Sequence, residues 1–450
     1  MPQTPETTVF PSDDDVRERL VKRLDQRGQG VGVVVGVVDA SGRRVIAHGD
    51  TTHGGGRPVG GDTLFEIGSA TKVFTTLLLA EMAERGEVAL DDPIARYLPA
   101  GVTAPTRGGR EITLIDLATH TAGLPPMDPG FRTTDPANPR ALVGQAEALA
   151  RYSAERLYAF LSAFELKRDI GARYVYSNLG LGLLGHLLAL RAGAAFETLL
   201  RQRITGPLGM TDTVMTPDAD QRRRLALPHN QRLQPRMTLR LDVLAGAGAL
   251  RSTANDLLTF LAAELGFIET PLRGAMAAQL APRRPTNLVR MRAALGWHVI
   301  DTGRDEIIGH GGATVGSVSY IAFDRQRRCG VVALNNARGA SDENLAWSLL
   351  TEGRAPARAG SLDPTALDAF IGRYALWSGS VLEVTRVDDQ LLAQLTVAGR
   401  QRPVRRIHQL TPTRFGWDDA NMEVTFVGEG RASEIVMHSA DGDRRCPRLA

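Results

Sequence analysis

The stretch Phe65-Glu66-Ile67-Gly68-Ser69-Ala70-Thr71-Lys72-Val73-Phe74 decides how the fold and chemistry of this chain are interpreted. From Ser69 onward, apolar residues recur with helical spacing as far as Arg85-Gly86, where the glycine predicts the end of a helix. This helix is apolar on nearly every side, so we expect it to be buried. Ser69 and Lys72 stand at positions i and i+3, which places both side chains on one face at its start.

Ser69 and Lys72 have the residue types of a nucleophile and its base. A serine hydroxyl is a weak nucleophile until a neighbouring group takes its proton, and burial lowers the pKa of a lysine amine toward that use. The chain holds 53 lysines and arginines, of which only three are lysines, so a lysine at this place favours chemistry that needs a titratable amine. The Ser69 N–H lies at a helix start, where the dipole stabilises an oxyanion. A solvent-facing lysine on an ordinary helix is the alternative.

Two further motifs could contribute to the same site. Tyr176-Ser177-Asn178 precedes an apolar helix, where a tyrosine can move a proton and an asparagine can hold a substrate amide; an ordinary N-cap is the alternative. His310-Gly311-Gly312-Ala313 precedes an apolar strand, and its glycines would let a substrate approach an edge strand. The Ala313 N–H could then be a second oxyanion donor, although a glycine-rich turn with an incidental histidine would read the same way.

Composition excludes several classes of protein. With 450 residues, 43% of them apolar, and a formal charge of +3, the chain is globular and offers no strong argument for binding nucleic acid or an anionic membrane. Its two cysteines, Cys329 and Cys446, form no metal cluster, and the histidines show no metal-ligand spacing, so no metal or cofactor is predicted. His120 is expected to be a structural hydrogen bonder. The first thirty residues lack the apolar segment of a signal peptide, and no apolar run of membrane-spanning length follows, which predicts a cytoplasmic protein without a membrane span. The oligomeric state is left open.

The order of patterns along the chain predicts an α/β (α+β) protein. Strand and helix patterns at about 15–90 and 241–355 enclose an α-rich part at about 91–240, so we expect one α/β domain over residues 1–355. The segment Thr351–Gly360 has the composition of a linker. After it, short alternating runs at 8 to 12 residue spacing predict that 356–450 hold the linker and a small all-β barrel.

Together the three motifs resemble those of the serine β-lactamase and penicillin-binding-protein superfamily, whose pattern is Ser-x-x-Lys, Ser-Asp-Asn and Lys-Thr-Gly. With Tyr-Ser-Asn and His-Gly-Gly in the second and third places, the chain looks like the class C β-lactamases and their esterase and D-peptidase relatives over roughly residues 15–355. Flanking segments agree, among them Leu117-Ala118-Thr119-His120-Thr121-Ala122-Gly123-Leu124 and Pro207-Leu208-Gly209-Met210. The resemblance implies an antiparallel sheet with flanking helices. The part after about 360 is similar to the lipocalin-like β-barrel of some members.

Carried over by position, the resemblance makes Ser69 the acyl-enzyme nucleophile, Lys72 its activating amine and Tyr176 the acid and base. Asn178 would hold the substrate amide, Gly312 and His310 would belong to the third motif, and the N–H groups of Ser69 and Ala313 would form the oxyanion hole. His310 would stand where other members carry a charged lysine. As a histidine it would be about half charged near pH 6.5, which disfavours penicillins and favours esters, amides or D-aminoacyl peptides.

Two functions stay open from the sequence, beside a non-catalytic module that the intact motifs disfavour. The first is a cofactor-free serine hydrolase acting through Ser69 on a small-molecule or short-peptide substrate. The second is a cytoplasmic acyltransferase or cyclising thioesterase of a nonribosomal peptide or polyketide pathway, in which an amine or alcohol replaces water.

Overall fold

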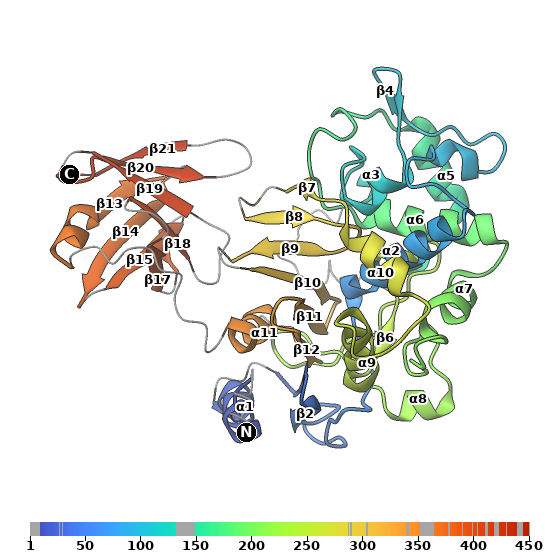
Figure 1. Cartoon of the computed structure of the whole chain (residues 1–450), viewed down its shortest axis with the longest axis horizontal. Helices are drawn as coiled ribbons and strands as arrows, with labels where there is room; N and C mark the ends of the chain where they lie inside the picture. The colour runs from blue at the N-terminus through green and yellow to red at the C-terminus, as the bar shows by residue number, and fades with distance from the viewer. Residues whose placement is uncertain are drawn as a thin grey trace, which may run out of the picture. The chain divides into compact units, whose positions relative to one another are not determined.

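The protein is described by a computed structural model with two large sheets, two small strand pairs and a set of helices around the eight-stranded sheet (Figure 1). The structure describes residues 10–131, 149–351 and 364–449, with short gaps at 27, 29, 287, 289, 303–304, 339–341, 377–378, 389, 398, 403, 410–412, 418–422, 429 and 439–443. The chain divides into two compact units. The first comprises 1–284, 293–300 and 305–353, and the second comprises 354–450 with the short segments 285–292 and 301–304.

The larger sheet has eight strands in the order β2-β1-β12-β11-β10-β9-β8-β7, and the pairs from β2 to β10 for which a register is defined are antiparallel. N-terminal strands β1 and β2 therefore pair with strands from the far end of this unit, as the sequence pattern predicts. The strands are β1 (Gly32–Asp39), β2 (Gly42–Gly49), β7 (Arg284–Pro285), β8 (Met291–Ala293), β9 (His298–Asp301), β10 (Glu306–Ala313), β11 (Val318–Asp324) and β12 (Cys329–Asn335). Two small pairs, β3 (Phe65–Glu66) with β6 (Arg251–Ser252) and β4 (Thr106–Arg107) with β5 (Arg110–Glu111), lie outside it.

Alternate residues of β1 belong to different hydrophobic clusters, because successive side chains of a strand point to opposite faces. Val34 and Val38 join the cluster that contains α2 and α9. Val33, Val35 and Val37 join the cluster that contains residues of α1 and α11. Both faces of the sheet are thus covered by helices, which explains why β1 is a continuous apolar run.

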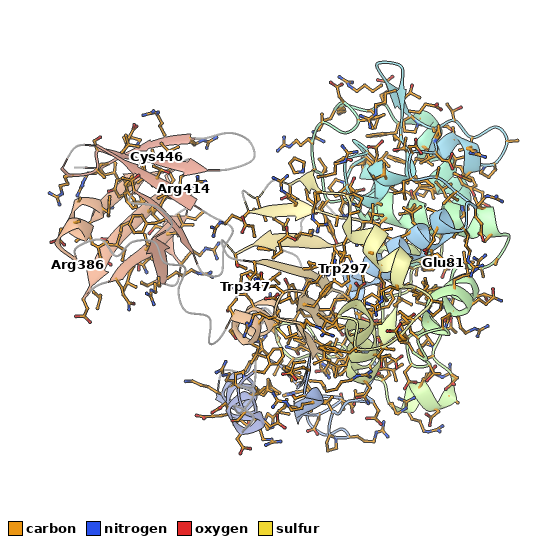
Figure 2. The ribbon with its side chains drawn as sticks, viewed as in Figure 1. Glu81, Trp297, Trp347, Arg386, Arg414 and Cys446 are labelled. Atoms are coloured by element: carbon orange, nitrogen blue, oxygen red, sulfur yellow. The ribbon has the colours of Figure 1, made fainter. Side chains whose placement is uncertain are left out.

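Helix α2 (Thr71–Glu84) lies in the larger cluster, and twelve of its fourteen residues are buried. Trp297, labelled in Figure 2, belongs to the same cluster, directly precedes β9 and stacks on Phe260 of α9 with 6.1 Å between ring centroids. The helices are α1 (Asp13–Val21), α2, α3 (Leu114–Ala118), α5 (Ala154–Ala163), α6 (Asn178–Ala192), α7 (Phe196–Leu200), α8 (Ala219–Arg223), α9 (Ala254–Glu264), α10 (Arg273–Leu280) and α11 (Asp342–Thr351). In the described part, α3 to α8 lie between 91 and 240, where the sequence predicts an α-rich part.

The second sheet has nine strands and its own hydrophobic cluster, which includes Cys446 (Figure 2). Its strands are β13 (Gly372–Ala375), β14 (Val381–Val387), β15 (Gln390–Val397), β16 (Arg400–Gln401), β17 (Arg405–Gln409), β18 (Arg414–Trp417), β19 (Glu423–Val427), β20 (Glu434–His438) and β21 (Arg444–Pro447). A bridge between Tyr374 and Arg448 joins the first strand to the end of the last, so the sheet closes on itself. Its likeness to a lipocalin-like barrel stays a prediction.

One local prediction differs from the structure. Residues 306–313 form a strand with neighbours on both sides, whereas the sequence suggested a turn or an edge strand there. The glycines weaken the strand pattern, and only the pairing with β11 reveals it. Within the predicted α-rich part, α5 begins at Ala154, and residues 132–148 lie outside the described residues. The expected linker 351–360 also lies outside them, apart from Thr351.

Candidate active site

Ser69 stands in a short 3-10 turn, Gly68–Ala70, that leads into α2. Gly68 has a φ of +49°, and a Cβ there would lie 2.8 Å from the Ala313 nitrogen, so only glycine allows this turn to approach β10 so closely. Gly312 is needed for the same reason, because its Cβ would lie 1.9 Å from the Ile67 carbonyl oxygen. The two glycines allow the turn that carries Ser69 to lie against the strand that carries the Ala313 N–H.

Lys72 is fully buried and has three polar neighbours. Its Nζ lies 2.9 Å from Ser69 Oγ, 2.7 Å from Asn178 Oδ1 and 2.7 Å from the carbonyl oxygen of Ala247. Burial lowers the pKa of Lys72 well below its ordinary value. In the part of the chain that the structure describes, no carboxylate forms an ion pair with it.

The three neighbours can accept from either form of the amine, and the lowered pKa of Lys72 favours the neutral one. The oxygens of Asn178 and Ala247 can only accept, so each takes one N–H of the amine. Among the three neighbours, only the Ser69 hydroxyl can also donate. A neutral Lys72 therefore directs its lone pair at the Ser69 O–H, which is the arrangement a general base requires.

Tyr176 and Asn178 flank Ser177, whose side chain accepts from the Gly180 N–H and caps α6. The N-cap interpretation of this motif therefore applies to Ser177, and the functional interpretation applies to Tyr176 and Asn178. The Lys72 Nζ lies 4.9 Å from the centroid of the Tyr176 ring. Burial raises the pKa of Tyr176 to about 12, partly offset by its hydrogen bond with Ser69. The phenol is therefore protonated near neutral pH and better suited to give a proton than to take one.

Residues 17–354 match the protein family described as Beta-lactamase, which is more than half of the chain. The chain belongs to the beta-lactamase family. It is 30% identical over 329 residues to "D-alanyl-D-alanine-carboxypeptidase/endopeptidase AmpH" of Escherichia coli K12, covering 70% of this chain and 82% of that protein. It is 25% identical over 372 residues to a beta-lactamase of the same organism, covering 75% and 93% of the two chains.

Solved structures agree with this assignment. A class C beta lactamase from Rhodobacter sphaeroides superposes with a TM-score of 0.64 and 26% identity, over 76% of this chain and 99% of that one. The predicted superfamily and fold class are thereby confirmed, and this beta-lactamase family member is a serine hydrolase. The roles of its individual site residues remain predictions that rest on the geometry above.

In this beta-lactamase family member, His310 differs from the sequence-based expectation of a half-charged group. Its side chain is buried, and its pKa lies well below the ordinary value because of burial and of the neighbouring His298 and Lys72. The expectation rested on the pKa of a histidine in water, which does not apply once desolvation disfavours the charged form. The site therefore offers no cation at the third motif near neutral pH.

Three residues of the site were missed or assigned another part in the sequence analysis. His298 stacks on His310 with 4.9 Å between ring centroids and an interplanar angle of 14°, and its Nε2 lies 3.0 Å from the Tyr174 hydroxyl. His120 was expected to be a structural hydrogen bonder, and its Nδ1 does accept from the Ser177 N–H at 3.0 Å. Its ring also packs on Tyr176, with 4.5 Å between centroids. In the sequence, the spacing of Tyr174 and Tyr176, two residues apart, was the one feature that could have pointed to Tyr174 as part of the site.

Among the described residues, no group of three or more histidine, cysteine, aspartate or glutamate side chains could hold a metal ion. No single helix within the described ranges has the length and apolar character needed to cross a membrane. The segments 178–192 and 196–205 are long and apolar enough only when they are taken together. The chain bends by 79° between them.

Proposed function

We propose that this protein hydrolyses ester or amide bonds through an acyl-enzyme on Ser69. The observation that supports this most strongly is the environment of Lys72, whose buried amine has two acceptors and one hydroxyl around it. An ordinary structural lysine would instead reach solvent or a carboxylate. Burying an amine without a counter-charge costs stability, which is reasonable where the neutral amine has a chemical role.

In the first half of the proposed reaction, Lys72 takes the Ser69 proton while Ser69 Oγ attacks the substrate carbonyl. The developing oxyanion accepts hydrogen bonds from the Ser69 and Ala313 N–H groups. Tyr176 donates its phenol proton to the leaving amine or alcohol and regains a proton from the Lys72 ammonium. Asn178 both accepts from Lys72 and directs its amide toward the substrate.

In the second half, water replaces the leaving group. Its oxygen adds to the acyl carbon while Lys72 takes its proton, and the ester bond to Ser69 then breaks. The proton returns to Ser69 Oγ, so the enzyme ends as it began and the product is a carboxylic acid.

The proposed substrate class rests on the charge of His310 in the site and on the named activity of a relative. The AmpH protein is named a D-alanyl-D-alanine-carboxypeptidase/endopeptidase. We therefore propose D-aminoacyl peptides and uncharged esters as substrates of this chain. A neutral His310 offers no charge to a substrate carboxylate, so β-lactams and other anionic substrates should be turned over less well. The cytoplasmic location remains a prediction from the sequence.

The test is covalent labelling followed by product analysis. A fluorophosphonate should label the protein at Ser69, as seen by intact mass, and Ser69→Ala should abolish labelling and lower turnover by several orders of magnitude. Labelling that persists in Ser69→Ala would place the nucleophile elsewhere. Product analysis with and without added amines or alcohols separates hydrolysis from acyl transfer or cyclisation, which no specific observation favours.

A further inference from the structure

The His310 imidazole has one ring nitrogen with a partner and one without. Nδ1 lies 2.6 Å from the Gly311 carbonyl oxygen. A carbonyl oxygen only accepts, so Nδ1 carries the proton. In a neutral ring, Nε2 is then a lone-pair acceptor. Nε2 is buried and has no hydrogen-bond partner among the described residues.

The ring stays neutral chiefly because burial disfavours a second proton. His298 stacks on one face of the ring, and Lys72 lies on the side of the nucleophile. Tyr174 has a raised pKa, owing to burial and then to Tyr176, so it is protonated and donates to His298 Nε2. His298 is thereby held in place without offering that nitrogen to His310.

The His310 side chain lies on the face of β10 that meets the turn carrying Ser69. Side chains two residues apart in a strand point to the same face, so His310 shares a face with Gly312, where an added Cβ would meet Ile67 and Ala70 on either side of Ser69. The Tyr176 ring centroid is 6.2 Å from that of His310. Nε2 is also the ring nitrogen farther from the backbone, since Nδ1 is turned back to Gly311.

We propose that His310 Nε2 accepts a hydrogen bond from the leaving-group side of the substrate. The site then selects acyl donors in which an uncharged N–H follows the cleaved bond, such as the next peptide bond of an interior amide. This inference rests on the proposed acyl-enzyme function and specifies its substrate class.

A buried acceptor discriminates strongly because the wrong group leaves it unpaired. The oxygen lone pairs and the negative charge of a terminal carboxylate would repel the Nε2 lone pair. An ester at the same place would present an oxygen in place of the N–H. The enzyme should therefore stabilise the transition states of the free acid and of the ester less well than that of the amide.

The experiment compares three peptides that differ only after the cleaved bond. These are N-acetyl-D-alanyl-D-alanine as its N-methylamide, its methyl ester and its free acid, with cleavage of the D-alanyl–D-alanine bond followed by mass spectrometry. The N-methylamide and methyl ester have nearly the same shape and differ in N–H against oxygen. We expect kcat/KM for the N-methylamide to exceed each of the others by about tenfold or more, the ratio for one hydrogen bond of ordinary strength.

Variants at the same position sharpen the comparison. His310→Phe keeps a buried ring without the acceptor, so it should remove the preference for the N-methylamide over the methyl ester. His310→Lys should raise kcat/KM for the free acid relative to both. His186→Phe is the matched control, because His186 pairs with the Tyr158 hydroxyl on helices α5 and α6 and should leave the preference unchanged.

The outcomes separate this inference from the proposed function. A wild-type protein that fluorophosphonate does not label at Ser69 contradicts the acyl-enzyme itself. Normal labelling with equal kcat/KM for N-methylamide and methyl ester overturns the role of Nε2 alone, as does a preference that survives His310→Phe. If His310→Phe does not fold, the wild-type comparison of the two peptides still decides.

Discussion

The Thr314 hydroxyl donates to Glu66 Oε2 over 2.6 Å, between two residues that stand 248 positions apart. Glu66 is three residues before Ser69, and Thr314 directly follows Ala313. The bond therefore ties together the two segments that carry the proposed oxyanion donors, the N–H groups of Ser69 and Ala313. Thr314 Oγ1 also accepts from the Ser317 N–H, and Glu66 faces Arg251 at 3.6 Å.

Thr314→Val should lower kcat more than it raises KM. Valine keeps the shape of threonine but leaves Glu66 Oε2 and the Ser317 N–H without this partner, so the two N–H donors lose their relative placement. We expect kcat to fall about tenfold, less than the loss of a whole oxyanion donor. The free energy of unfolding should fall by about 1 to 3 kcal/mol.

The matched control is Thr213→Val. Thr213 donates to the buried Asp256 over 2.8 Å, which is the same kind of pair at another place. It should lose similar stability in denaturant unfolding while kcat stays near the wild-type value. If both variants reduce kcat equally, the Thr314–Glu66 bond has no positioning role.

The pH dependence of kcat/KM should report a neutral Lys72. The active form is the free amine, so activity rises with pH through the lowered pKa of Lys72 and then levels off. The opposite limb comes from the Tyr176 phenol, whose pKa is raised to about 12, so the plateau should extend over the alkaline range. The groups around Lys72 in the described residues, including His120, His298 and His310, have lowered pKa values and add no limb above neutral pH.

The test uses the N-methylamide peptide, for which both the base and the acid are needed. Lys72→Arg, which stays protonated, should reduce kcat/KM by at least about a thousandfold while circular dichroism shows a folded protein. A rise in activity centred on the ordinary lysine pKa would mean that Lys72 is charged in the resting enzyme.

Glu264→Gln should stabilise the protein in mildly alkaline solution. Glu264 Oε1 is buried with no hydrogen-bond partner among the described residues, and burial raises the pKa of this carboxyl to about 8. Between the unfolded value near 4.3 and about 8, the unfolded state is ionised while the native carboxyl is protonated, so stability falls as pH rises through this window. The glutamine variant has no such dependence.

Thermal unfolding at several pH values tests this. The variant should exceed the wild type by about 1 to 3 kcal/mol at pH 9 and by much less at pH 5. The exposed Glu111→Gln on β5 should show no pH-dependent difference. A constant difference at every pH would show that packing, rather than ionisation, causes the effect.

A chain ending at Glu352 should fold and keep Ser69 reactive. The C-terminal sheet has its own hydrophobic cluster, which draws no residue from the helices and strands that hold the active site. Fluorophosphonate labelling and thermal unfolding of this shortened chain check the expectation. Aggregation, or loss of labelling, would show that residues 353–450 are needed for folding or for the site.

Local sequence was sufficient for the nucleophile and its helix. The spacing of Ser69 and Lys72 on an apolar helix predicts a shared buried face, because helix geometry is set by nearest neighbours along the chain. The same holds for Tyr176 and Asn178 at the start of α6. The superfamily and fold class, predicted from three short motifs in order, are confirmed.

Only the tertiary structure decided the charge and the partners of the third motif. His298 and His310 stack because β9 and β10 are neighbours in the sheet, which no pattern in either segment shows. Glu66 and Thr314 meet for a similar reason. The sequence determined which residue types stand at the motifs, but burial sets their protonation, and burial depends on packing by segments distant in the chain. That is why the sequence predicts a half-charged His310, whereas burial lowers the pKa of this residue in the folded protein.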